Sequence, residues 1–366
     1  MSPTNNKKIL YAASTTSHLE RFHTPYIEKM RTIATVKTMG DSEGADFTVA
    51  FDKHFFSFSN LKSILKIRRI LKKERFDAVI VHTTLAAFLI RTAMLCMRRP
   101  YVLNVVHGYL FSQKPQGMKD RILLLCERLL RPMTDDIAVM NAEDAEIART
   151  HRLCRGKVCF ICGMGVPQKT LSQKANRDLL STLPILDGDF VCTFVGELSH
   201  RKNQSFLVNA TKSLVDQGLP AKLLLIGEGA DHEALEEQIK SLGLGDHVFL
   251  LGTKSNVPEY LAATDLYVSA SRSEGLPFNI MEAMACGLPI LASDTKGQND
   301  LLDKDSLYPL DDMTAFCESV NRIRAGGQFG IGTKQYPILQ RYTLDAVFDE
   351  NMKIMTLGWI DHENER

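Results

Sequence analysis

The chain has 366 residues, of which 45% are hydrophobic and 24% charged, with a net charge of +1 at pH 7. A chain of this length is too long to fold around a single ordinary hydrophobic core, and its composition excludes an intrinsically disordered protein. We therefore expect two globular domains. The charge is unevenly divided: residues 1–170 carry 27 Lys and Arg against 15 Asp and Glu, whereas the rest carries 17 against 28. A basic first half predicts contact with an anionic membrane surface, although attraction between the two halves, or solvation, explains it equally well.

The same composition excludes other partners and placements. Nucleic acid is not expected, because the basic half lacks the aromatic and groove-reading features that such binding needs. Arginines such as Arg91 and Arg121 break the longest apolar runs before they reach membrane-spanning length. The N-terminus has no apolar signal core ahead of the strand expected at Ile9, and most of the eight cysteines lie scattered in apolar surroundings. We therefore expect a cytoplasmic protein, at most peripheral at the inner face of the plasma membrane.

Strands alternate with helices along the chain, which predicts an α/β fold built on doubly wound parallel sheets. We expect one Rossmann-like domain in residues 1–170, a linker in 171–188, a second domain in 189–340 and a last helix in 341–366. The expected strands are 7–13, 46–51, 77–82, 101–106, 135–140 and 157–162, then 190–196, 221–227, 247–251, 266–270 and 289–292. The expected helices are 19–30, 60–75, 84–97, 117–131 and 142–150, one that starts near Gln204, a short one after Pro277, and Leu344–Trp359.

Polar residues follow the first predicted strand, where Ser17, His18 and His23 stand in a loop without glycine. Without glycine the backbone cannot approach a diphosphate closely. We therefore expect this loop to form part of the binding site for an acceptor substrate. The two histidines are open to a catalytic role, a metal-binding role or a place at a helix start. His107 directly follows the strand predicted at 101–106, at the edge where open α/β sheets bind ligands, and we predict it in the site. A capping or packing histidine is the alternative.

Residues 273–289 contain a short predicted helix with Pro277 at its start and Gly287 after its end. Leu276 at the expected cap position cannot accept hydrogen bonds, which leaves the first-turn amides and the positive helix dipole for an anion. Glu274 and Glu282 lie on either side of this predicted anion-binding site. Carboxylates there would accept hydrogen bonds from neutral hydroxyls, as in the two sugars of a nucleotide sugar, although two solvated glutamates on an amphipathic helix are the alternative.

Two motifs together resemble a known family. Glu274-Gly275-Leu276-Pro277 with Glu282, and the earlier Gly196-Glu-Leu-Ser-His-Arg201-Lys202, are similar to the signature of the retaining GT-B glycosyltransferases, glycosyltransferase family 4. The first-loop pattern resembles a subgroup of exopolysaccharide and capsule assembly. The resemblance implies two Rossmann-like domains facing across a cleft, the acceptor on the first and the nucleotide sugar on the second, with a last helix that crosses back. It implies that Arg201 and Lys202 hold the donor diphosphate, that Gly196 and Gly275 line the donor site, and that backbone near Gly252 lines the base pocket.

The resemblance implies retaining transfer of a hexose or N-acetylhexosamine from a nucleotide sugar, expected to be a UDP-sugar, to an acceptor expected to be lipid-linked. His107, Arg201, Lys202 and Glu274 are the expected catalytic residues. No metal-binding Asp-x-Asp motif is identified, and the cations with the helix dipole can stabilise a departing diphosphate, so no metal or other cofactor is expected. Two alternatives remain: a sugar-nucleotide 2-epimerase of the same fold, and a non-catalytic sugar-nucleotide-binding partner of another transferase.

Overall fold

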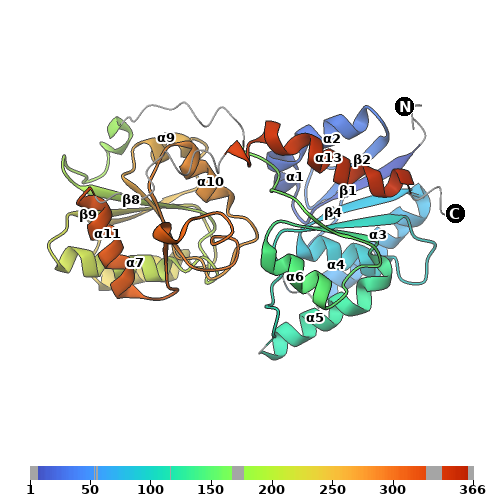
Figure 1. Ribbon diagram of the computed structural model, residues 1–366, viewed down its shortest axis with the longest axis horizontal. Helices are drawn as coiled ribbons and strands as arrows, with labels where there is room; N and C mark the ends of the chain where they lie inside the picture. Colours follow the sequence, from blue (N-terminus) through green and yellow to red (C-terminus); the bar gives the residue numbers. More distant parts are fainter. Residues whose placement is uncertain are drawn as a thin grey trace. The chain divides into compact units, whose positions relative to one another are not determined.

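The computed structural model describes residues 7–52, 54, 57–115, 117–166, 177–326 and 340–361. The chain forms two compact units, each considered by itself below. The first domain comprises Met1–Gly165 with Asp345–Arg366, and the second comprises Val166–Leu344. Figure 1 labels the helices and strands for which there is room.

The first domain is built on a seven-stranded parallel sheet with the order β3-β2-β1-β4-β5-β6-β7. The central strands β4 and β5 are buried along their whole length, which explains their continuous apolar sequences. Chain order reverses between the paired neighbours β1 and β4, so this is the switch point of the sheet. The strands are β1 (Lys8–Ala12), β2 (Thr35–Gly40), β3 (Phe47–Thr48), β4 (Ala78–His82), β5 (Tyr101–Val106), β6 (Asp136–Val139) and β7 (Val158–Phe160).

Helices cover both faces of this sheet, as Figure 1 shows. On one face α3 and α4 pack their apolar sides on β1 and β4. On the other face, the ring of Tyr26 of α2 packs against Phe348 of α13, with 4.9 Å between the centroids, and Tyr26 donates a hydrogen bond to the Met164 carbonyl at 3.1 Å. The helices are α1 (Thr16–Phe22), α2 (Thr24–Arg31), α3 (Phe58–Glu74), α4 (Thr84–Ala93), α5 (Met118–Leu130), α6 (Ala142–Thr150) and α13 (Leu344–Asp361), with the 3₁₀ turn η1 (Arg131–Met133).

The second domain repeats this plan around a six-stranded parallel sheet with the order β10-β9-β8-β11-β12-β13. One apolar core holds α7, α8 and α11 against one face, and a second core holds α9 and α10 against the other. The strands are β8 (Phe190–Val195), β9 (Ala221–Ile226), β10 (Val248–Gly252), β11 (Leu266–Ser269), β12 (Ile290–Ser293) and β13 (Leu307–Tyr308). The helices are α7 (Gln204–Asp216), α8 (His232–Ser241), α9 (Val257–Ala262), α10 (Phe278–Ala285) and α11 (Met313–Arg324), with the 3₁₀ turns η3 (Arg177–Leu180) and η4 (Lys304–Ser306).

The predicted α/β class with two doubly wound sheets is confirmed. The single helix expected at 19–30 is wrong: the chain forms α1 and α2, which meet at His23, because Pro25 at the start of α2 has no N–H for a continuous helix. Strand β2 was missed, since its Lys37 and threonines interrupt the apolar pattern, and β3 spans only two residues of the strand expected at 46–51.

The segment expected as a linker falls into two parts. Residues 171–176 lie outside the described residues. Residues 177–188 belong to the second domain, where Leu180 is buried in the core and Arg177 pairs with Asp265 at 2.5 Å. The last helix, α13, contributes to the first domain, where the Asn351 amide donates to the Gly163 carbonyl at 2.7 Å.

A buried ion pair between α4 and α5 gives a test of the first domain. Arg91 is fully buried and donates two hydrogen bonds to the Glu127 carboxylate, at 2.9 and 2.7 Å. We expect Arg91→Met to lower the free energy of unfolding by roughly 3–5 kcal/mol, because it leaves a buried carboxylate unpaired. The double variant Arg91→Met/Glu127→Leu should recover most of this loss.

Urea unfolding of the full chain measures these differences. The control is Lys212→Met, which breaks the exposed pair of Lys212 with Asp216 in the second domain and should cost less than about 1 kcal/mol. Equal stability of Arg91→Met and Lys212→Met would contradict the structural role of the buried pair.

Candidate active site

The two motifs of the second domain meet at the switch point of its sheet. Strands β8 and β11 are paired neighbours, and the helices that follow them, α7 and α10, pack on opposite faces. The loop after β8 carries Arg201 and Lys202, and the loop after β11 carries Glu274. Open α/β sheets bind ligands at such points, beyond the carboxyl ends of the strands.

Glu274 joins the two loops directly. Its Oε1 accepts a hydrogen bond from Lys202 Nζ at 2.5 Å, and its Oε2 accepts one from Arg201 Nη1 at 2.8 Å. The same Arg201 nitrogen donates to the Ser273 carbonyl at 3.0 Å. A backbone hydrogen bond from the Arg272 amide to the Arg201 carbonyl, at 2.8 Å, ties the loops again. We call Arg201, Lys202 and Glu274 the Glu274 network.

Burial and charge oppose each other in this network. Only 8% of the Glu274 side chain and 10% of the Lys202 side chain are exposed, against 42% for Arg201. Burial alone raises the pKa of Glu274, but the charges of Lys202 and Arg201 outweigh it, and the pKa lies below its ordinary value. Burial lowers the pKa of Lys202, and the attraction of Glu274 offsets only part of that change. The network therefore holds a carboxylate and two cations, with one cation reaching solvent.

Helix α10 begins next to this network. Its N-cap is Pro277, whose extended backbone leaves Phe278 as the first helical residue, so the predicted cap at Leu276 is wrong by one position. Pro277 has no side-chain group to bond the first-turn amides. The helix thus begins without a side-chain cap, as expected, and Gly275 and Leu276 form the loop that leads into it. The positive end of its dipole adds to the charge of the two cations.

Glu282 lies on α10 and is partly exposed. Glu282 and Glu274 both act on the buried Tyr267 of β11: burial raises the pKa of Tyr267 most, and the two negative charges add to the rise. Asn279 of the same helix donates to the Val195 carbonyl at 2.6 Å, which fixes α10 to the end of β8.

Glycines connect the carboxyl ends of three neighbouring strands. The Gly196 amide donates to the Ile226 carbonyl and the Gly227 amide to the Gly252 carbonyl, both at 2.9 Å. A Cβ on Gly227, whose φ is 140°, would lie 2.0 Å from the Gly196 oxygen. This close backbone approach places the predicted residues Gly196 and Gly252 along one edge, with Gly196 the nearer to Lys202.

In the first domain, histidines gather at the corresponding switch point. His18 lies in α1, His23 joins α1 to α2, His82 ends β4 and His107 follows β5. Ring centroids of His18 are 4.9 Å from His23 and 5.0 Å from His107, and His82 lies 4.0 Å from His23. A ring hydrogen bond of 3.1 Å joins His82 Nδ1 and His107 Nε2. We call these four residues the histidine cluster.

The environment keeps these imidazoles neutral. Burial is the largest influence on each, and it lowers the pKa of His18 to about 4 and the pKa values of the other three well below the ordinary range. The structure therefore brings together His18, His23 and His107 of the predicted residues, whereas Ser17 is exposed on α1.

His82 and Tyr11 also lie in this site, and neither was predicted from the sequence. Tyr11 on β1 is fully buried, stacks on His82 with a centroid distance of 4.8 Å, and bonds His23 Nδ1 at 2.9 Å. The signal for His82 was available, because it ends one predicted strand as His107 follows another. Only the pairing of β4 with β5 shows that these strand ends meet.

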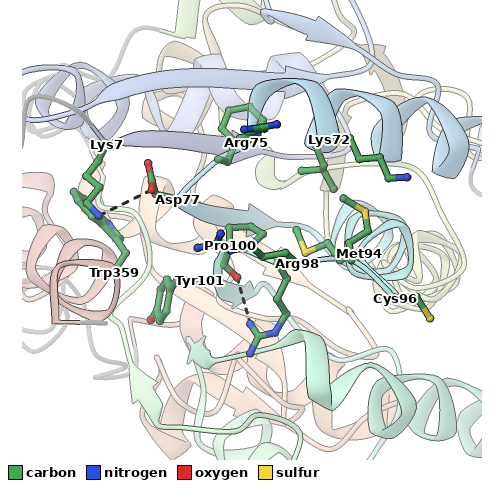
Figure 2. Close-up of a pocket in the computed structure, with 14 residues that line it drawn as sticks. Lys7, Lys72, Arg75, Asp77, Met94, Cys96, Arg98, Pro100, Tyr101 and Trp359 are labelled. Atoms are coloured by element: carbon green, nitrogen blue, oxygen red, sulfur yellow. Dashed lines mark hydrogen bonds and ion pairs between the residues drawn. The ribbon is translucent and has the colours of Figure 1, made fainter. Parts of the chain in front are cut away.

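A cavity lies elsewhere in the first domain. A cavity of about 840 Å³ opens beside the amino ends of β1, β4 and β5, and Figure 2 shows Lys7, Lys72, Arg75 and Arg98 around it. None of the predicted site residues lines it. Its position is opposite to the edge where parallel sheets bind their ligands, so we do not include it in the active site.

Comparison with known proteins agrees with this geometry. Residues 44–163 match the model of the glycosyl transferase 4-like domain, and residues 177–325 match that of glycosyl transferases group 1. The putative glycosyltransferase EpsD of Bacillus subtilis (strain 168) is 27% identical over 336 residues, which cover 87% of each chain. The UDP-Gal:alpha-D-GlcNAc-diphosphoundecaprenol alpha-1,3-galactosyltransferase of Escherichia coli is 26% identical and covers 78% of this chain and 76% of its own.

A solved structure confirms the fold. Anabaena HepE in complex with UDP-glucose has a TM-score of 0.76 at 17% identity, covering 95% of this chain and 99% of its own. Two Rossmann-like domains with these matches define a glycosyltransferase of the GT-B fold. The chain belongs to the family 4 type of these enzymes, as its motifs predicted.

Gly297 gives a test of the site's architecture. Its φ is 82°, and a Cβ there would lie 2.7 Å from the Glu274 carbonyl oxygen and 2.8 Å from that of Gly275. We expect Gly297→Ala to shift the loop that carries Glu274 and to lower glycosyl transfer at least about tenfold, since small misplacements of catalytic groups are costly.

The matched control is Gly218→Ala, which has the same φ of 82° but no atom within 4 Å of the added carbon. It should carry only the left-handed strain of about 1–2 kcal/mol and keep full transfer activity. Equal activities of the two variants would show that the close approach at Gly297 does not hold the site.

Proposed function

We propose that this enzyme transfers a hexose or N-acetylhexosamine from a UDP-sugar to a lipid-linked saccharide, with retention at the anomeric carbon. The reaction belongs to surface polysaccharide synthesis, at the cytoplasmic face of the membrane. The observation that carries the proposal is the Glu274 network, in which one buried carboxylate fixes two cations beside the start of α10. One excess positive charge and the helix dipole suit a diphosphate.

The donor is assigned from this charge and from the relatives. The E. coli relative is named for UDP-Gal, and HepE was solved with UDP-glucose. In this chain the diphosphate would lie against Arg201 and Lys202, and the base beyond the glycine edge that ends at Gly252. Glu282 on α10 would accept hydrogen bonds from the ribose hydroxyls, because a neutral diol is a suitable partner for a carboxylate there.

In the transfer step, the bond between the anomeric carbon and the UDP oxygen breaks while a bond to the acceptor oxygen forms. The acceptor's proton passes to the departing phosphate, so no protein base is required. Arg201, Lys202 and the α10 dipole stabilise the charge that develops on UDP, and this step needs no metal or other cofactor.

Glu274 acts in this proposal as a positioning residue. Both of its oxygens are already hydrogen-bonded, one to Lys202 and one to Arg201, and its side chain is buried. Such a carboxylate is poorly placed to attack an anomeric carbon. Its free lone pairs remain available for the hydroxyls of the transferred sugar.

We expect Glu274→Ala to lower turnover at least about 100-fold, because the cations lose the partner that places them. UDP release from a panel of UDP-sugars, measured with a membrane extract as acceptor, gives the rate, and NMR of the product gives its anomeric configuration. The control is Glu236→Gln, an exposed position on α8 that should keep the unmutated rate.

Two results would overturn parts of this proposal. Rescue of Glu274→Ala by azide, with an inverted glycosyl azide as product, would make Glu274 a nucleophile. Binding of UDP-sugars by the unmutated protein without UDP release, with every acceptor tried, would favour a sugar-nucleotide-binding partner of another transferase.

The acceptor side is assigned to the first domain. His18, His23 and His107 lie together beyond the carboxyl ends of its strands, at the edge where open α/β sheets bind their ligands. A lipid-linked acceptor is supported by the E. coli relative, which is named for a diphosphoundecaprenol substrate.

An exposed apolar face on α5 supports peripheral membrane contact. Leu125 and Leu129 are 54% and 65% exposed and lie one turn apart, with Met118 and Ile122 on the same face. Among the described residues no helix has the length and apolarity needed to cross a membrane. An exposed apolar helix face in a domain of net positive charge is typical of proteins that lie on anionic membranes.

We expect the protein to sediment with vesicles that contain phosphatidylglycerol and less with pure phosphatidylcholine. Leu125→Glu/Leu129→Glu should weaken binding at least about tenfold, since it removes two apolar side chains from the contact. Leu186→Glu, at a 73% exposed position in the second domain, is the control and should bind as the unmutated protein does. Equal binding of all three would remove α5 from the contact.

A further inference from the structure

The histidine cluster contains ring nitrogens that the fold leaves without partners. Among the described residues, His18 Nε2, His23 Nε2 and His82 Nε2 are buried and have no hydrogen-bond partner. His23 is fully buried, so an unpaired ring nitrogen there costs free energy unless a ligand binds it. One ring nitrogen from each of His18, His23 and His107 lies within 4.8 Å of the others.

We propose that His18, His23 and His107 bind a divalent transition-metal ion of the zinc class. Three imidazoles on one side of an ion match the ligand number of open zinc sites, and the fourth tetrahedral position is left for water. Ligand nitrogens around zinc lie roughly 3.4 Å apart, so small side-chain rotations close the site. His18 is partly exposed and provides the entry path.

The hydrogen bonds around the cluster support a metal. The Tyr11 hydroxyl donates to the Met355 sulfur at 3.9 Å, which leaves its oxygen to accept from His23 Nδ1 at 2.9 Å. In that tautomer His23 Nε2 carries a lone pair, as a ligand must. His82 bonds His107 and orients its ring in the same manner. Outer residues that fix ligand tautomers are a usual feature of metal sites.

A neutral imidazole binds zinc-class metals through the ring nitrogen that carries no proton. The ion would join α1, the junction of α1 and α2, and the end of β5, and so would fix the acceptor-side loop. The ion would take no part in stabilising the departing UDP, which is the proposed role of the Glu274 network in the second domain.

Cobalt gives the direct test. Tag-free full-length protein, stripped with a chelator, is titrated with Co²⁺ while its visible absorption and melting temperature are recorded. We expect one Co²⁺ per chain, the intense absorption bands of a four-coordinate site, a higher melting temperature, and loss of the bands when Zn²⁺ displaces cobalt.

Variants locate the site. His18→Ala and His107→Ala should weaken Co²⁺ binding at least about 100-fold, and Tyr11→Phe, which keeps the ring and removes only the hydroxyl, about tenfold. His54→Ala, at an exposed histidine outside the cluster, should bind as the unmutated protein does. Absence of stoichiometric Co²⁺ binding at micromolar concentrations, or unchanged affinity in both His18→Ala and His107→Ala, would overturn the proposal.

Discussion

The reversal of strand order is the constraint on which both sites depend. In each domain the first strand pairs on one side with the next strand in sequence and on the other with a later one: β1 with β4, and β8 with β11. Because β8 and β11 send their helices to opposite faces, the loops that carry Lys202 and Glu274 start side by side and then separate. Lys202 and Glu274 can therefore form a hydrogen bond across the end of the sheet. In the first domain Tyr11 and His82 stack on each other at the equivalent place.

The Glu274 network shows why such an arrangement serves binding more than stability. A buried ion pair gains little for folding, since desolvation of both charges offsets their attraction. The attraction of Glu274 instead holds Arg201 and Lys202 in place near helix N-termini, where cations are otherwise disfavoured. The histidine cluster differs in kind, because its groups are neutral and its unpaired nitrogens remain unsatisfied in the protein alone. The second domain presents positive charge to a phosphate, and the first presents the lone pairs of imidazole nitrogens to a metal ion.

Local signals made much of this predictable. Pro277 and Gly287 limited α10 to within one residue, the end of a predicted strand indicated His107, and the family motif indicated Arg201. Longer-range features could not be predicted. The bond between Lys202 and Glu274 joins residues 72 positions apart and requires the pairing of β8 with β11. His82 joins the cluster only because β4 lies between β1 and β5. The break at His23 was missed because the apolar pattern continues through it.

The proposed function depends on the Glu274 network binding the diphosphate of the donor. Calorimetric titration with UDP and with uridine tests it most directly, because the two ligands share the base and ribose and differ only in the diphosphate. We expect the unmutated protein to bind UDP at least about 100-fold more tightly than uridine, and Arg201→Gln/Lys202→Gln to lose most of this difference. Equal affinities for the two ligands, or a difference that survives in the double variant, would contradict it.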